Sequence, residues 1–194
     1  MVVLNKIYTR TGDDGTTALG NMERRPKHDR RIDSYGTVDE VNALIGVARL
    51  HVEDERLEAM LARIQNDLFD LGADLATPDP TPSEGGETLD YEPLRIVPAQ
   101  VKRLEEDIDR LNGDLQPLRS FVLPAGTAAS AHLHVARTVA RRAERLMVEL
   151  REREAVGEAC MRYVNRLSDF LFVAARWVNA RGEDDVLWVP GANR

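Results

Sequence analysis

The sequence predicts an all-α fold, a bundle of five helices in one domain that spans residues 1–194. Aromatic residues make up only 5% of the chain, whereas Ala, Leu, Arg and Glu are plentiful, which favours helices over sheets. Apolar residues recur at steps of three and four in five separate segments. One Pro- and Gly-rich stretch interrupts this pattern, and it is too short to separate two domains.

Residues 1–28 precede the first periodic segment and are predicted to form a loop-rich arm. The motif TRTGDDGTT, residues 9–17, can turn backbone N–H groups and hydroxyls toward an anion. It is not a Walker A loop, because no Gly-Lys-Ser/Thr follows, and a plain turn-rich arm remains the alternative. The motif ERRPK ends in Lys27, and its cations could equally form a solvated basic patch.

The helical bundle is expected over residues 33–181. The first helix should begin with Asp33 or Ser34 as its N-cap, and the second at about Asp54. The core positions of these two helices are predicted to be Val38, Val41, Ile45 and Ala48, then Leu57, Leu61, Ile64, Leu68, Leu71 and Leu75. Residues 77–97 are rich in Pro and Gly and should form a surface crossover loop.

The third helix should run from Pro98, which suits a first turn, to the NGD at residues 112–114. FVLPAGT is then a short extended link, and Thr127 caps a fourth helix that continues to about Glu154. The fifth helix is expected from Glu158 to Arg181, with Gly182 as its end. Core positions of the third and fifth helices are Val101, Leu104, Ile108 and Leu111, then Met161, Val164, Leu167, Leu171, Ala174 and Val178.

Bulk properties exclude several classes of function. The formal net charge of −7 argues against a nucleic-acid partner. No segment is apolar enough for a signal peptide or a membrane span, so we expect no membrane association and a cytoplasmic location. Cys160 is the single cysteine, which excludes an intramolecular disulfide and a cysteine metal cage, and its setting predicts a small buried hydrophobe.

The fourth helix carries a row of arginines. Arg137, Arg141 and Arg145 lie at i, i+4 and i+8, so they share one face and repel one another unless an anion neutralises them. Guanidinium groups suit polyphosphate oxygens, although an exposed, salt-bridged helix is the alternative. Glu144 lies one step off the row, and Arg142 points elsewhere.

Polar residues on the fifth and first helices are also candidates. Asn165 and Asp169 in YVNRLSDF are embedded among apolar residues, which indicates either a site or a structural hydrogen-bond network. Asp39 and Glu40 in YGTVDEVN follow a helix start, where the helix dipole alone favours acids.

Six motifs, taken together, resemble one family. TRTGDDGTT, ERRPK, YGTVDEVNALIG, FVLPAGT, HVARTVARRAER and YVNRLSDFLFVAARW appear in the order and spacing of PduO-type ATP:corrinoid adenosyltransferases. The resemblance covers residues 6–177. It implies a ferritin-like five-helix bundle that assembles as a homotrimer, with ATP bound between neighbouring subunits.

The resemblance also implies a reaction, transfer of the 5′-deoxyadenosyl group of ATP to the cobalt of reduced cobalamin, with release of triphosphate. Mg²⁺ is the expected companion of ATP, and no dedicated metal-ligating residues are expected. Cobalt(I) is itself a strong nucleophile, so the protein need not supply one. A reductase and an adenosylcobalamin-dependent acceptor enzyme are the expected protein partners.

The site residues follow from matching positions. Phe121 would close the lower face of the corrin, and Asp39 and Arg137 would form a salt bridge between subunits. The arm residues expected around the nucleotide are Thr9, Arg10, Thr11, Gly12, Asp13, Gly15, Thr17, Ala18 and, on the phosphates, Lys27. The residues expected from the neighbouring subunit are Arg141, Arg142, Glu144, Arg145 and Asn165.

Two positions depart from the family pattern, and three other functions remain open. Asp14 stands where many relatives have a lysine, and Ala125 stands in LPAG where LPGG is usual. The alternatives are another nucleotide-dependent transferase, a carrier or sensor of ATP or cobalamin, and a structural helical oligomer.

Overall fold

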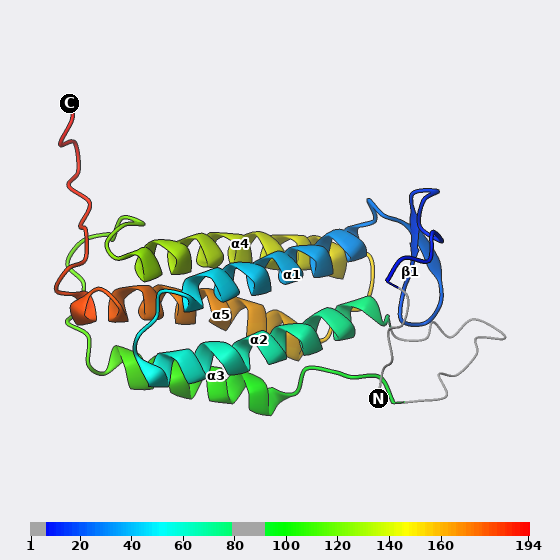
Figure 1. Cartoon of the computed structure of the whole chain (residues 1–194), viewed down its shortest axis with the longest axis horizontal. Coiled ribbons are helices and arrows are strands. Elements are labelled where there is room, and N and C mark those ends of the chain that lie inside the picture. Colours follow the sequence, from blue (N-terminus) through cyan, green and yellow to red (C-terminus); the bar gives the residue numbers. More distant parts are fainter. Residues whose placement is uncertain (1–6, 79–91) are drawn as a thin grey trace.

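The computed structural model describes residues 7–78 and 92–194. Its main elements are five α-helices, which confirms the predicted all-α bundle (Figure 1). The elements are β1 (Thr16–Ala18), β2 (Arg24–Pro26), α1 (Arg30–Arg49), α2 (Glu55–Ala76), α3 (Pro98–Asn112), α4 (Ala128–Arg151), α5 (Glu158–Trp177) and the short 3₁₀ helix η1 (Ala180–Gly182). Much of the predicted crossover at 77–97 lies outside the described residues.

The helices pack around one hydrophobic core. Helix α1 lies against α2 and α4, and α5 lies against α3 and α4. The predicted leucine stripe of α2 is confirmed, since every one of its members is buried. Cys160 is buried as predicted, and its thiol donates to Asp74 Oδ2 over 2.9 Å. Burial and this carboxylate raise the pKa of the Cys160 thiol, so it stays neutral.

Three predicted helix boundaries are wrong, and one of them is the end of α4, which lies at Arg151 and not at about Glu154. Helix α1 begins at Arg30, because the Asp29 carboxylate accepts a hydrogen bond from the Arg31 N–H and caps the helix there. Ser34 lies inside the helix, where its hydroxyl donates to the Arg30 carbonyl. Helix α5 ends at Trp177, and Gly182 instead ends the 3₁₀ helix that follows, in which Arg181 has a positive φ of 54°.

The arm contains a small antiparallel hairpin that the sequence did not indicate. Strands β1 and β2 pair with Thr17 opposite Arg25, and Leu19 in their connecting turn is buried. Gly20 N–H donates to the Ala76 carbonyl over 2.8 Å, which fixes the turn to the end of α2. In the part of the chain that is described, no helix is long and apolar enough to cross a membrane.

The arm and the chain's C-terminal segment lie at opposite ends of the bundle (Figure 1). The arm lies where α4 ends, and the C-terminal segment extends from the end where α4 begins. Helix α4 has 24 residues. At about 1.5 Å per residue, such a helix separates the two ends by about 36 Å.

Candidate functional site

The TRTGDDGTT motif of the arm, residues 9–17, forms a tight loop in front of β1. Arg24 donates to the Thr11 carbonyl over 2.5 Å and to the Thr16 hydroxyl, so one guanidinium spans the loop. A Cβ added at Gly12 would lie 3.1 Å from the Thr16 carbonyl oxygen and 3.2 Å from Lys27 Nζ, so this position favours glycine. The arm residues named from the sequence are therefore gathered in one loop, with Lys27 beside it.

Asp14, the first departure from the family pattern, has a local role. Its carboxylate accepts from the Thr16 N–H over 2.9 Å and from the Thr16 hydroxyl over 2.8 Å. These hydrogen bonds lower the pKa of Asp14. Asp14 thus closes the loop toward β1, and Arg24, 3.5 Å away, offsets its charge.

The cations of ERRPK are not equivalent. Arg24 is engaged by the loop, and Arg25 lies 2.6 Å from the Glu154 carboxylate. Lys27 is exposed, and within the described ranges its side chain has no carboxylate partner. Lys27 is therefore the cation of this motif that remains available to a phosphate, and the alternative of a solvated patch fails for both arginines.

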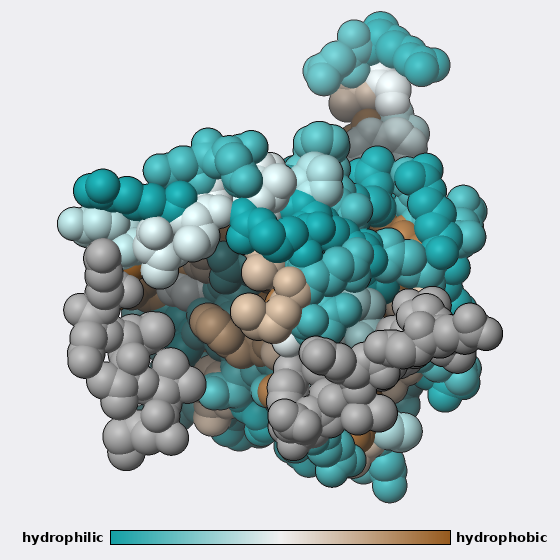
Figure 2. Space-filling model, turned by 90° about the vertical axis from the view of Figure 1, so that its right-hand side faces the viewer, coloured by the Kyte–Doolittle hydropathy of each residue, from teal (hydrophilic) through white to brown (hydrophobic). Residues whose placement is uncertain are grey.

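The end of the bundle that carries the arm has a largely hydrophilic surface with a small apolar area in its middle (Figure 2). The hydroxyl groups of Thr9 and Thr11, in the arm, form a hydrogen bond of 3.0 Å. Most of the expected nucleotide contacts of the arm are exposed; these are Thr9, Arg10, Thr11, Asp13, Gly15 and Ala18, whereas Gly12 and Thr17 are half-buried.

The arginine row on α4 has the predicted geometry. Arg141 and Arg145 are exposed, and within residues 7–78 and 92–194 no member of the row forms a salt bridge with a carboxylate. Arg137 Nε is buried without a hydrogen-bond acceptor, and burial together with Arg141 lowers the pKa of Arg137. The salt-bridged alternative therefore does not hold for this row, which presents unneutralised positive charge.

The residues around the row divide into two groups. Glu144 and Asn165 lie together, since the Asn165 amide donates to Glu144 Oε1 over 2.7 Å and links α4 to α5. Arg142 instead forms a salt bridge with Glu40 of α1, which places it on a different side of α4. Asp39 is exposed on α1, and among the residues that the structure describes it pairs with no cation, Arg137 included.

Phe121 lies in the link before α4 and is 77% exposed. The Trp188 ring meets it edge-on, with ring centroids 5.9 Å apart. Backbone hydrogen bonds hold the two segments together, from Trp188 N–H to the Phe121 carbonyl over 2.8 Å and from Leu123 N–H to the Val186 carbonyl over 2.8 Å. No role was predicted for the C-terminal segment, and its run of Val, Leu and Trp is the signal that could have indicated one.

Asn179 anchors the link that presents Phe121. It is fully buried and accepts from the Thr127 N–H over 3.0 Å. Gly126 has a φ of +103°, and a Cβ there would lie 2.4 Å from the Asn179 side chain. Ala125, the second departure, has no positive φ, so its methyl group adds no backbone strain.

A pocket of about 580 Å³ lies between α3, α5 and the loop that follows α3. Ile108, Leu118, Phe172 and Val173 supply apolar walls, and Asp169 supplies a charge. Behind Phe172 lies His134, which is 1% exposed and, among the residues that the structure describes, has no hydrogen-bond partner on either ring nitrogen. Burial lowers the pKa of His134, and Arg137 adds to the effect. Neither Phe172 nor His134 was singled out from the sequence.

The described residues contain no cluster of three or more His, Cys, Asp or Glu side chains that could hold a metal ion. A Mg²⁺ ion chelated by nucleotide phosphates needs only one or two protein carboxylates. Asp13 fits that requirement, because it is exposed in the arm and its carboxylate is not engaged by another side chain that the structure describes.

Residues 7–178 match the family described as Cobalamin adenosyltransferase. The chain belongs to this family. Its resemblance to PduO-type enzymes, inferred from six motifs, is thereby confirmed.

Relatives within the cobalamin adenosyltransferase family cover nearly all of the chain. A corrinoid adenosyltransferase of Mycobacterium tuberculosis is 48% identical over an alignment of 196 positions that covers 100% of this chain and 97% of the relative. A corrinoid adenosyltransferase of Bacillus subtilis is 43% identical, over 91% of this chain and 88% of the relative.

Solved structures show the same fold. A phenylalanine-to-alanine variant of a PduO-type ATP:corrinoid adenosyltransferase from Lactobacillus reuteri, complexed with cobalamin and ATP, has a TM-score of 0.82 and 36% identity. It covers 94% of this chain and 99% of its own. An arginine-to-lysine variant of the same enzyme, complexed with ATP, has a TM-score of 0.80 and 35% identity.

Proposed function

We propose that this protein transfers the 5′-deoxyadenosyl group of ATP to the cobalt of cob(I)alamin, forming adenosylcobalamin and triphosphate. In this reaction a cobalt–carbon bond forms at C5′ as the bond from C5′ to the triphosphate oxygen breaks. The observation that carries the ATP half is the row of Arg137, Arg141 and Arg145 on α4, which has no salt-bridging carboxylate among the described residues.

The arm and the arginine row have complementary tasks. Thr9 to Thr17 supply hydroxyls and backbone N–H groups around the nucleotide, and Lys27 supplies a positive charge for its phosphates. Arg141 and Arg145 stabilise the charge that accumulates on the leaving triphosphate. Glu144 and Asn165, joined by their hydrogen bond, would orient the nucleoside. Mg²⁺ bound to the phosphates, with Asp13 as a ligand, would neutralise further charge.

Phe121 and the neighbouring apolar pocket carry the corrinoid half. An aromatic ring under the corrin excludes water and the lower axial ligand from cobalt, which favours the reduced, nucleophilic Co(I) state. Trp188 buttresses Phe121 from the side, and Phe172 lines the pocket next to this link. The corrinoid site is therefore proposed at the end of the bundle where α4 begins.

Two copies of the chain are needed to complete this site. The arm is fixed at the end of α4 and Phe121 precedes its start, which separates them by about 36 Å. C5′ of ATP must reach cobalt, so the arm of one subunit has to act on the corrinoid of another. A homotrimer with three equivalent interfaces satisfies this requirement, and the unpaired Asp39 and Arg137 would then meet across the interface.

The test is anaerobic incubation with chemically reduced cob(I)alamin, ATP and Mg²⁺, followed by absorbance. We expect the spectrum of a cobalt–carbon bond to appear, together with triphosphate. Binding of both ligands without this change would support a carrier instead of an enzyme. Absence of ATP-dependent protection against thermal unfolding would support a structural oligomer.

A further inference from the structure

Two adjacent arginines on β2 point to opposite sides of the hairpin, as successive strand residues do. Arg24 reaches back to the Thr11 carbonyl and the Thr16 hydroxyl, so it organises the nucleotide loop. Arg25 reaches the other way, toward the bundle. Arg24 thus orders the loop internally, whereas Arg25 attaches the hairpin to the bundle.

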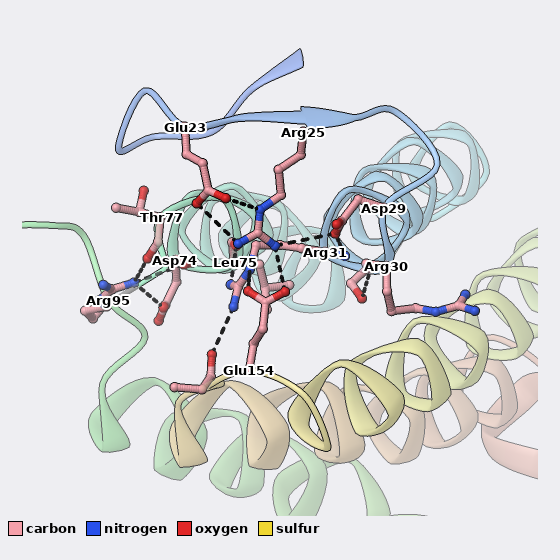
Figure 3. A network of polar contacts seen from close by, with 12 residues as sticks. Glu23, Arg25, Asp29, Arg30, Arg31, Asp74, Leu75, Thr77, Arg95 and Glu154 are labelled. Atoms are coloured by element: carbon pink, nitrogen blue, oxygen red, sulfur yellow. Dashed lines mark hydrogen bonds and ion pairs between the residues drawn. The ribbon is translucent and has the colours of Figure 1, made fainter. Parts of the chain in front are cut away.

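Arg25 is tied to the bundle by Glu154, in the short segment between α4 and α5 (Figure 3). Arg25 Nη1 donates to Glu154 Oε1 over 2.6 Å, and Arg25 Nε donates to Glu23 over 2.8 Å. The Arg25 side chain is only 16% exposed. Hydrogen bonds to Glu23 and Glu154 raise the pKa of Arg25, so its donors are committed inside the protein.

Glu154 is itself held by a second arginine. Arg31 Nε donates to Glu154 Oε2 over 3.0 Å, and the Arg31 side chain is 2% exposed. Arg31 also donates to the carbonyls of Leu75 and Ala155, which fixes the end of α2 against the segment that holds Glu154. Burial alone would raise the pKa of Glu154, but the hydrogen bonds from Arg25 and Arg31 outweigh it and lower that pKa.

Among the residues that the structure describes, the hairpin has few other attachments to the bundle. Apart from the chain's continuation into α1, its turn is bound to the end of α2 by the hydrogen bond from Gly20 to Ala76, and Leu19 in the turn is buried. That contact holds one end of the hairpin. The orientation of β2, which carries Lys27 just beyond it, then depends on Arg25.

We propose that Arg25 and Glu154 are a positioning pair, which sets the nucleotide loop and Lys27 at the angle needed to grip the triphosphate. Neither residue touches the nucleotide. Glu154 supplies the fixed point, because Arg31 holds it, and Arg25 transmits that position to the hairpin. This assignment rests on the proposed function, since it concerns how the arm binds ATP.

The positioning assignment and simple electrostatics predict opposite changes in ATP affinity when the charge of Glu154 is removed. Removing a carboxylate near a triphosphate should strengthen ATP binding if charge alone matters. Under the positioning assignment, Glu154→Gln weakens ATP binding, as does Arg25→Ala, each by about three- to tenfold. The double variant should bind ATP no more weakly than the weaker-binding single variant, because the two substitutions remove the same attachment. Arg25→Lys should recover part of the loss.

The experiment is titration calorimetry of ATP with these four variants and with Arg153→Ala as the matched control. Arg153 neighbours Glu154 but, in the described part of the chain, pairs only with Glu149 on the surface, so its removal should leave ATP affinity within twofold. Hydrogen exchange without ATP should quicken at residues 9–18 in Arg25→Ala and stay unchanged in α1 to α5.

Three results would overturn the assignment. Unchanged or tighter ATP binding in Glu154→Gln, together with weaker binding in Arg25→Ala, would make Arg25 a phosphate contact. Unchanged affinity in both would leave the pair without a role in binding. Faster hydrogen exchange throughout the bundle in Arg25→Ala would show that the pair stabilises the whole fold and does not specifically position the nucleotide loop. A wild-type protein that does not bind ATP would instead contradict the proposed function.

Discussion

The Phe121 and Trp188 rings meet edge-on, 5.9 Å between centroids, across two segments that are 67 positions apart in the chain. Their backbones are also joined, through Trp188 N–H and the Phe121 carbonyl. Phe121 is therefore exposed on one side and supported on the other. An exposed aromatic ring held in this way can cover a flat apolar ligand without moving aside.

Phe121→Ala is expected to lower kcat strongly and to leave ATP affinity within about twofold, because the proposed contact of the ring is with the corrinoid and not with ATP. Steady-state kinetics with cob(I)alamin and an ATP titration would measure the two effects. Equal losses in kcat and ATP affinity would contradict the assignment of Phe121 to the corrinoid.

Trp188→Ala removes the lateral support of Phe121, so we expect the KM for cob(I)alamin to rise and kcat to fall less than in Phe121→Ala. Aromatic pairs of this kind contribute about 0.5–1.5 kcal/mol, or roughly two- to tenfold. Trp188→Phe keeps a ring and serves as the control. Equal loss of activity in Trp188→Ala and Trp188→Phe would show that the edge-on ring contact does not determine activity.

Arg141→Ala should chiefly damage ATP use, since Arg141 lies in the row without salt-bridging carboxylates. Loss of one preorganised donor costs about 2.7–4 kcal/mol of barrier, or roughly 100- to 1,000-fold in kcat. Arg142→Ala is the control on the next position, because Arg142 is already paired with Glu40. Unchanged kcat and KM for ATP in Arg141→Ala would refute the role of the row.

Gly126→Ala should destabilise the link before α4, because the position has a positive φ and the new Cβ would collide with Asn179. The expected cost is about 1–3 kcal/mol, measured by thermal or urea unfolding. Ala125→Gly, one residue earlier, should cost far less, since Ala125 adopts an ordinary φ. Similar losses in both variants would show that the backbone conformation is not the cause.

Cys160 is expected to resist thiol reagents in the folded protein at pH 8. Burial raises the pKa of its thiol, and the reactive thiolate is therefore scarce. Labelling with a chromogenic disulfide should be slow in buffer and should reach one equivalent in denaturant, since the chain has one cysteine. Rapid labelling of the native protein would indicate that the helices around Cys160 open readily.

Local patterns were enough to predict the helices and the arginine row. The α2 stripe follows from a 3.6-residue period, and Thr127 caps α4 as expected because its hydroxyl accepts from the Ser130 N–H. The start of α1 was missed because Asp29 and Asp33 both suit an N-cap, and only the surrounding structure decides between them.

Contacts between distant segments could not be predicted in this way. The pairing of Arg25 with Glu154 joins positions 129 residues apart, and no periodicity in the sequence indicates it. The same holds for Trp188 beside Phe121, whose partnership depends on where α5 ends. The sequence indicated which residue types could bind ATP, whereas the separation of the arm from Phe121 emerged only from the fold.

The central claim is that the arm of one subunit completes the corrinoid site of another, and mixing two inactive variants tests it most directly. Lys27→Ala disables the arm, and Phe121→Ala disables the corrinoid side of the site. Mixed oligomers, formed by co-expression, should recover about a quarter of the wild-type rate, because a quarter of their interfaces combine two intact halves. No recovery in verified mixed oligomers would contradict the claim and place the whole site within one chain.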